Sequence, residues 1–156
     1  MLKITIKNNL PNIFLPRFQS FCIRNRIIDD FRIGGPSFVF SRAGVLYDRI
    51  VKNSFVHFVS YDIKTVMSLS YKSYKDYEDH ECLYINFLFT YDDAKISIRD
   101  GKEFVSSSAA LIKKRFPLVR VLWADVVRVD RKDLYMRYCK MSGFTIEEGS
   151  TIFLDI

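Results

Sequence analysis

The sequence predicts an α+β domain with three layers, in which helices flank a central β-sheet. The chain has 156 residues, of which 49% are hydrophobic and 15% aromatic, and a chain of this length can bury a sizeable core. Three strand-like segments follow one another in the middle, whereas helix-like and strand-like segments alternate after about residue 100. We therefore expect residues 1–156 to form one domain with the element order β-α-α-β-β-β-α-β-α-β-β.

The first third is expected to contain a strand and two helices. Residues 2–6 alternate apolar and polar side chains, which is typical of a half-buried strand, and apolar residues recur at helical spacing over 13–24. Gly34-Gly35-Pro36 is the strongest helix breaker in the chain. We therefore expect the second helix only near 43–52, with Val45 among the residues that pack inward.

The middle of the chain is expected to be an antiparallel meander. Residues 54–61, 65–74 and 81–91 are rich in β-branched and aromatic side chains. Short turns connect them, the second of which is the charged segment 75–80. The third strand is the most apolar of the three, so we expect it at the centre of the sheet.

The last third is expected to return to alternating helices and strands. Pro117 ends the first of its helices and Gly143 ends the second. The predicted helix, strand, helix and two hairpin strands cover residues 102–115, 119–129, 131–142, 144–147 and 151–154.

Composition limits the classes of function. The net charge is +6, and the first 50 residues hold eight Lys or Arg against three Asp or Glu, which suits an anionic partner, either a nucleotide cofactor or a nucleic acid. Cys22, Cys82 and Cys139 lie far apart and the chain has only two histidines, so neither a disulfide framework nor a metal site is expected. The sequence has no apolar run of membrane-spanning length. We expect a soluble, cytoplasmic protein with reduced thiols.

Residues 137–144, RYCKMSGF, end a predicted helix on glycine and open a strand with an aromatic residue. This segment resembles the FYEKLGF signature of the GNAT superfamily of N-acyltransferases, which move an acyl group from coenzyme A to an amine. The predicted element order is similar to that of the family along the chain, and the match is best over 118–156. The resemblance implies a mixed, mostly antiparallel sheet, acetyl-CoA or another acyl-CoA as donor substrate, and no metal. Small phage-encoded members are similar in size, which implies a phage protein in the host cytoplasm.

The resemblance also implies a donor site. In the family, an Arg/Gln-x-x-Gly-x-Gly/Ala segment holds the pyrophosphate before a helix, and the central strand holds the pantetheine arm. The single surviving glycine is Gly101, and Asp100 beside it would repel a phosphate. The alternative is that Gly101 is an ordinary turn glycine with no role in donor binding. The implied donor-binding residues are Phe87, Leu88, Phe89, Thr90, Arg99, Gly101 and Lys102.

For catalysis, the resemblance implies a base and an acid. Glu81, at the start of the central strand, is the candidate base, with His80 as second choice; the alternative is that both belong to a solvated turn. The acid tyrosine of the family falls on Cys139 here, so Tyr138, displaced by one position, is the candidate acid. Packing of Tyr138 between helix and sheet is the alternative.

Three functions remain open at this point. The first is acyl transfer in a ternary complex to an amine of a protein, a peptide or a small molecule. The second is a catalytically inactive phage structural or host-interaction protein that keeps the fold. The third, less favoured, is nucleic-acid binding through the basic N-terminal third and the interleaved aromatic and basic residues 71–75. Exposed aromatic residues could also build a homodimer.

Overall fold

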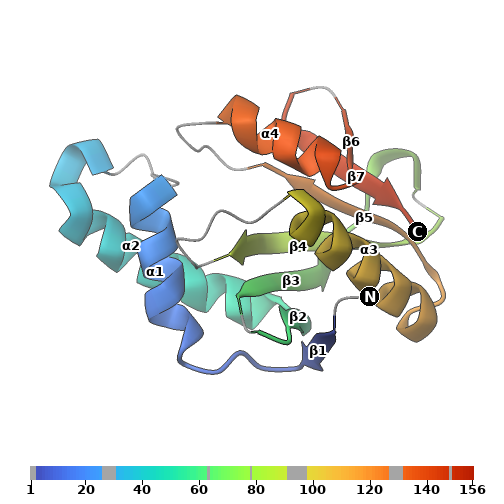
Figure 1. The fold of residues 1–156 in the computed structure, drawn as a ribbon, viewed down its shortest axis with the longest axis horizontal. Helices are drawn as coiled ribbons and strands as arrows, with labels where there is room; N and C mark the ends of the chain where they lie inside the picture. Colours follow the sequence, from blue (N-terminus) through green and yellow to red (C-terminus); the bar gives the residue numbers. More distant parts are fainter. Residues whose placement is uncertain are drawn as a thin grey trace.

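The computed structural model describes residues 3–25, 31–62, 64–77, 79–90, 98–126, 132–147 and 149–156. The predicted order β-α-α-β-β-β-α-β-α-β-β is confirmed (Figure 1). The elements are β1 (Ile4–Lys7), α1 (Phe14–Asn25), α2 (Phe31–Asn53), β2 (Val56–Ser60), β3 (Thr65–Tyr71), a short 3-10 helix (Lys75–Tyr77), β4 (Glu81–Thr90), α3 (Ile98–Arg115), β5 (Val119–Asp125), α4 (Lys132–Met141), β6 (Thr145–Ile146) and β7 (Thr151–Asp155).

The strands form one seven-stranded sheet in the order β1-β2-β3-β4-β5-β7-β6. Strands β1 to β4 pair antiparallel in succession, which confirms the predicted meander, and β7 pairs antiparallel with both β5 and β6. The β4–β5 pair is parallel. The sheet is therefore mixed and mostly antiparallel, and β4 lies at its centre as predicted.

Helices cover both faces of the sheet, and alternation along the strands decides which side chains each pair of helices meets. Phe58 and Met67 belong to the same buried cluster as the inner residues of α3 and α4. Their neighbours Val59 and Val66 belong to the cluster built on α1 and α2. Consecutive strand residues point to opposite faces, so α1 and α2 form one outer layer and α3 and α4 form the other (Figure 1).

The second helix is longer than the sequence predicted, and of the residues expected on its inner face Val45 was wrong, whereas Leu46 and Ile50 pack against the buried cluster. Helical structure occurs on both sides of Gly35, whose φ of 67° and ψ of −162° form a kink, and Pro36 then stands in the first turn of the main segment, where proline is tolerated. Val45, expected to be inside, is 52% exposed. The buried residues are instead Val39, Ala43 and Tyr47, which recur every fourth position.

The third helix also begins earlier than predicted. Because α3 starts at Ile98, Gly101 lies in its first turn and not in a loop before it. Gly143, with φ of 112°, ends α4 as expected, and β6 and β7 form the predicted terminal hairpin. The predicted strand end at 127–129 lies outside the described residues. In the described part of the chain, no helix is both long and apolar enough to span a membrane.

Candidate active site

The two parallel strands at the centre of the sheet part from each other. Their pairing runs from Glu81 opposite Val119 to Tyr84 opposite Trp123. Beyond that pair β4 continues to Thr90 alongside β3, whereas β5 continues alongside β7. Figure 1 shows the strands diverging toward the left of the view, at their carboxyl ends. In open α/β sheets, ligands bind at the carboxyl ends of strands where the topology changes, which makes this divergence the first feature of a candidate site.

A β-bulge lies in β4 where the divergence begins. Ser68 pairs with Phe87 and Leu69 with Ile85, so Asn86 is an extra residue on β4. The Asn86 amide donates to Ser54 Oγ at 2.7 Å and accepts from Ser70 Oγ at 3.2 Å. A bulge bends its strand and increases the local twist. The two side-chain hydrogen bonds hold this bend next to the point where β5 departs.

Tyr138 packs its phenol against the first turn of α3. A Cβ atom added to Gly101 would lie 2.6 Å from Tyr138 Cζ and closer still to Tyr138 Oη. Gly101 therefore lies in a helical turn and not in an ordinary loop turn, and its missing Cβ leaves room for a phenol of this same chain. Burial raises the pKa of Tyr138, opposed by the nearby Ser142 hydroxyl and supported by the charge of Asp100. The phenol stays protonated at neutral pH.

Cys139, on which the resemblance places the family's tyrosine, has a different environment from Tyr138. It is 3% exposed within the cluster shared by α3, α4 and the sheet. Burial raises the pKa of its thiol to about 12, so the group is neutral and unsuited to nucleophilic attack. All three cysteines are free and buried. Among the described residues, no group of three or more His, Cys, Asp or Glu side chains could hold a metal ion.

The structure does not bring the two candidate catalytic residues together. Glu81 is exposed and is the first residue of β4, five residues before Asn86, which is about 16 Å along a strand. His80 is exposed at the same end. Tyr138, by contrast, touches the start of α3, the helix that follows the other end of β4.

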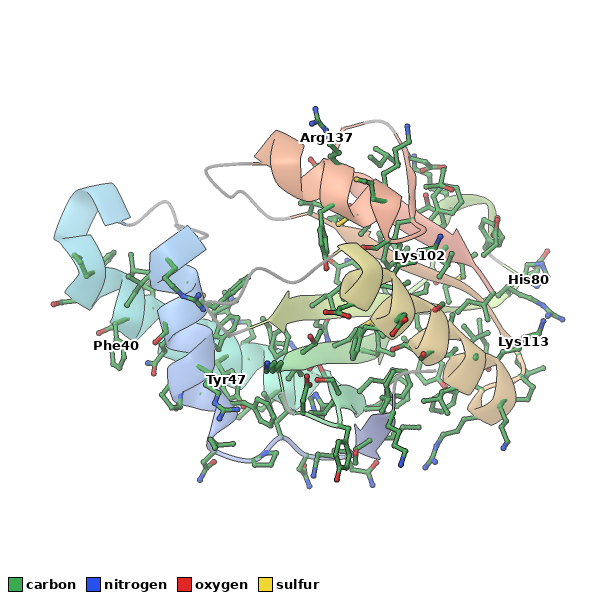
Figure 2. The ribbon with its side chains drawn as sticks, viewed as in Figure 1. Phe40, Tyr47, His80, Lys102, Lys113 and Arg137 are labelled. Carbon is green, nitrogen blue, oxygen red and sulfur yellow. The ribbon has the colours of Figure 1, made fainter. Side chains whose placement is uncertain are left out.

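The candidate donor-binding residues have different surroundings. Phe87 stacks on Phe18 at 5.3 Å, on the face covered by α1 and α2, whereas Leu88 packs on the opposite face. Lys102 is exposed on the first turns of α3 (Figure 2). The side chains of Phe89, Thr90 and Arg99 lie outside the described residues.

Sequence reasoning missed a cation–aromatic group beside the divergence. Tyr84 meets Trp123 edge-on with ring centroids 4.7 Å apart, and Lys72 Nζ lies 4.5 Å from the Tyr84 centroid and 5.4 Å from that of Trp123. Burial raises the pKa of Tyr84, and the charge of Asp125 adds to this. The signal available was the alternation of aromatic and basic residues over 71–75, but Tyr84 and Trp123 come from other strands.

Comparison with known proteins identifies the fold. No protein-family model matches the sequence, and no curated protein matches it either. Among solved structures, NAA60 of Arabidopsis thaliana in complex with a bisubstrate analogue matches with a TM-score of 0.59 and 11% identity, over 99% of this chain and 98% of that one. A GNAT-family acetyltransferase from Bacillus anthracis matches with a TM-score of 0.57 and 7% identity, over 100% and 96%. A GNAT-family N-acetyltransferase from Escherichia coli in complex with CoA matches with a TM-score of 0.51 and 12% identity, over 99% and 82%. The chain therefore has the fold of the GNAT acetyltransferases.

Proposed function

We propose that the chain is an acyl-CoA-dependent N-acyltransferase that moves an acyl group, most simply acetyl, to an amine. The observation that carries this proposal is the divergence of β4 and β5 beside the Asn86 bulge, in a chain with the GNAT fold. The Arabidopsis neighbour was also solved with acetyl-CoA, and the Escherichia coli neighbour with CoA. By analogy, the donor's thioester arm would lie along the carboxyl half of β4, including Phe87 to Thr90.

The reaction needs an amine, a proton acceptor and a proton donor. The neutral amine attacks the thioester carbon, so that an N–C bond forms and the C–S bond breaks. Tyr138 is the candidate proton donor for the departing thiolate, because burial raises its pKa and keeps the phenol protonated. Glu81 lies too far along β4 to take the amine proton directly, so we propose that solvent takes it.

The phosphates of the donor would sit at the start of α3. The amides of a first helical turn and the positive end of the helix dipole favour an anion, and Lys102 adds a positive charge there. We also propose Arg99, the second residue of α3, as a phosphate-binding residue. Asp100 opposes phosphate binding, and the Tyr138 phenol already fills the space beside Gly101. We therefore assign phosphate binding to Lys102 and the first-turn amides, without a cradle at Gly101.

A thermal-shift experiment with acetyl-CoA, free CoA and ADP tests this proposal. A ligand at 100 times its Kd adds about 2.7 kcal/mol of stability, which raises the Tm of a chain of this size by about 5–10 °C. Lys102→Glu should weaken CoA binding about tenfold, since charges about 4 Å apart interact by about 1–4 kcal/mol near a protein surface. Lys113→Glu, at the other end of the same helix (Figure 2), is the matched control and should bind normally. Absence of a shift with all three ligands would contradict the proposal.

A catalytically inactive structural or host-interaction protein is the second candidate. The observation that favours it is the phenol of Tyr138 against Gly101, where a donor phosphate could otherwise approach the helix. This candidate predicts no thermal shift with acetyl-CoA, CoA or ADP. The same experiment therefore separates the two functions.

A further inference from the structure

Three aromatic rings from separate parts of the chain pack together near the amino end of β4. Tyr71 stacks on Phe55 with ring centroids 4.6 Å apart and planes 10° from parallel, and Phe55 meets Phe116 edge-on at 5.6 Å. The Tyr71 side chain is 53% exposed although one face of its ring lies on Phe55. The ring therefore presents its other face to solvent, as a flat apolar surface backed by two further rings.

The last turn of α3 places three basic side chains beside these rings. Lys113, Lys114 and Arg115 are exposed, and Phe116 follows them directly in the chain. Figure 2 shows Lys113 and His80, the residue before β4, at the same end of the molecule. Within the described part of the chain, none of the three basic side chains forms an ion pair. Their charges are therefore available to a partner.

The rings and the cations share one face of the sheet. Phe55 and Phe116 pack against the cluster that faces α3 and α4, and Tyr71 lies two residues after Leu69 of that cluster. An opposing charge is also present: burial raises the pKa of the Tyr71 phenol, and the charge of Glu81 adds to this. Three cations against one carboxylate leave the area positive. We refer to the three rings and the three cations together as the Tyr71 surface.

An exposed ring face beside unpaired cations fits a ligand that carries both flat rings and negative charges. Single-stranded nucleic acid has this chemistry, because its bases stack on aromatic side chains while Lys and Arg bind its phosphates. An acidic peptide would satisfy the cations, but the exposed face of Tyr71 would then have no role. The observations therefore favour a nucleic acid strand with accessible bases.

We propose that the Tyr71 surface binds single-stranded nucleic acid. A base stacks on the exposed face of Tyr71, and the phosphates on either side of it bind the three cations of α3. The surface lies at the amino end of β4, whereas the candidate active site lies beyond the Asn86 bulge, toward the other end of that strand. The two sites are separate, so this inference does not depend on the proposed acyl transfer.

The salt dependence of binding tests the role of the cations. The full chain is titrated into a fluorescein-labelled oligothymidylate of about 12 nucleotides, and fluorescence anisotropy is measured at a series of salt concentrations. Each phosphate contact adds about 0.7 to the slope of log Kd against log salt, so three contacts give a slope of about 2. Lys113→Ala and Lys114→Ala should each lower this slope by about 0.7. Lys102→Ala, near the other end of the same helix, removes the same charge and should leave the slope unchanged.

Variants of Tyr71 separate stacking from charge. Tyr71→Ala should weaken binding about fivefold or more at every salt concentration, with the slope unchanged, because the stacked base is lost. Tyr71→Phe keeps the ring and should bind as the natural chain does. Tyr61→Ala is the control, since it removes another tyrosine, 75% exposed, from just after β2. An abasic strand of the same length keeps the phosphates without the bases, and the natural chain should bind it about fivefold or more weakly.

Each contrary outcome overturns the inference in a different way. If Lys102→Ala weakens binding as much as Lys113→Ala, the strand binds through net charge and not through this surface. If the abasic strand or a polyglutamate peptide of equal length binds as tightly as the oligothymidylate, the surface does not select bases. If Tyr71→Ala binds as the natural chain does, no base stacks there. The proposed function is judged separately, by the thermal shift with acetyl-CoA and CoA.

Discussion

Replacement of Gly101 by alanine is expected to destabilise the folded chain, the opposite of its usual effect in a helix. In most helices this replacement stabilises by up to about 1 kcal/mol, because alanine loses less conformational entropy than glycine. Gly101 has no positive φ, so its backbone accepts alanine. The new Cβ, however, would lie 2.6 Å from Tyr138 Cζ and 3.2 Å from Ser142 Oγ. Tyr138 or the start of α3 must therefore move.

The magnitude follows from two opposed effects. Overpacking of a tight contact costs about 1–3 kcal/mol, and the gain in helix propensity offsets up to about 1 kcal/mol. Gly101→Ala should therefore lower the free energy of unfolding by about 1–2 kcal/mol, which lowers the Tm of a chain of this size by about 2–8 °C. Urea denaturation and thermal melts measure both quantities.

A double-mutant cycle isolates the cause. In a Tyr138→Ala background the obstacle is absent, so Gly101→Ala should become neutral or stabilising by up to about 1 kcal/mol. Gly44, in α2, is the control: its added Cβ would meet only Gln19 Nε2, at 3.2 Å, which donates to the Phe40 carbonyl at 3.1 Å. That contact is relieved by a shift of a few tenths of an ångström, so alanine there should change stability by less than about 1 kcal/mol. Stabilisation by Gly101→Ala in the natural chain would refute the reasoning.

Three further predictions concern a buried histidine, the asparagine of the bulge and one turn. Burial lowers the pKa of His57 to about 4, below the value near 6.5 expected in the unfolded chain. The unfolded chain thus takes up a proton that the folded chain excludes, so the stability from neutral His57 is complete above pH 6.5 and is lost as the pH falls toward 4. Urea denaturation at a series of pH values should show this loss of stability. His57→Gln should reduce the loss, and the control His80→Gln, at an exposed site, should leave it unchanged. Asn86→Ala should lower the free energy of unfolding by about 1–3 kcal/mol, because two hydrogen bonds are lost: Ser70 Oγ loses its acceptor, and Ser54 Oγ loses a donor while it keeps its bond to the Ile50 carbonyl. Urea curves coincident with the natural chain would contradict this. Gly143→Ala should lower it by about 1–2 kcal/mol, because φ of 112° disfavours any residue with a Cβ, and an unchanged midpoint would show that the turn relaxes freely.

The sheet was predictable because its signals are local. Period-two alternation, β-branched residues and short polar turns mark each strand of the meander, and the apolar character of residues 81–91 indicates the central strand. The error in α2 has a physical cause. Gly35 kinks the chain and Pro36 opens a new helical segment, after which burial of Val39, Ala43 and Tyr47 against β2, β3 and α1 stabilises the helix from its start.

The candidate site was less predictable because its contacts join distant residues. Gly101 lies in α3 and Tyr138 in α4, with β5 and two loops between the helices, so no spacing rule relates the two residues. The helical start at Ile98 was missed because Asp and Gly are typical of loops, although an acidic residue in the first turn, such as Asp100, is favoured by the helix dipole. The group formed by Lys72 and two rings from other strands depends on strand register, which pattern analysis leaves undetermined.

The bulge at Asn86, the group formed by Lys72 and Tyr84, and the contact of Tyr138 with Gly101 lie around the divergence of β4 and β5. On β4 the bulge at Asn86 is held by two hydrogen bonds from the face that carries α1 and α2, and Lys72 lies over Tyr84 on that same face. On the opposite face, Gly101 admits Tyr138 against the first turn of α3. In the proposed acyl transfer, Tyr138 would approach the thioester from the face that carries α3 and α4, and the amine would approach it from the face that carries Lys72 and the Asn86 hydrogen bonds.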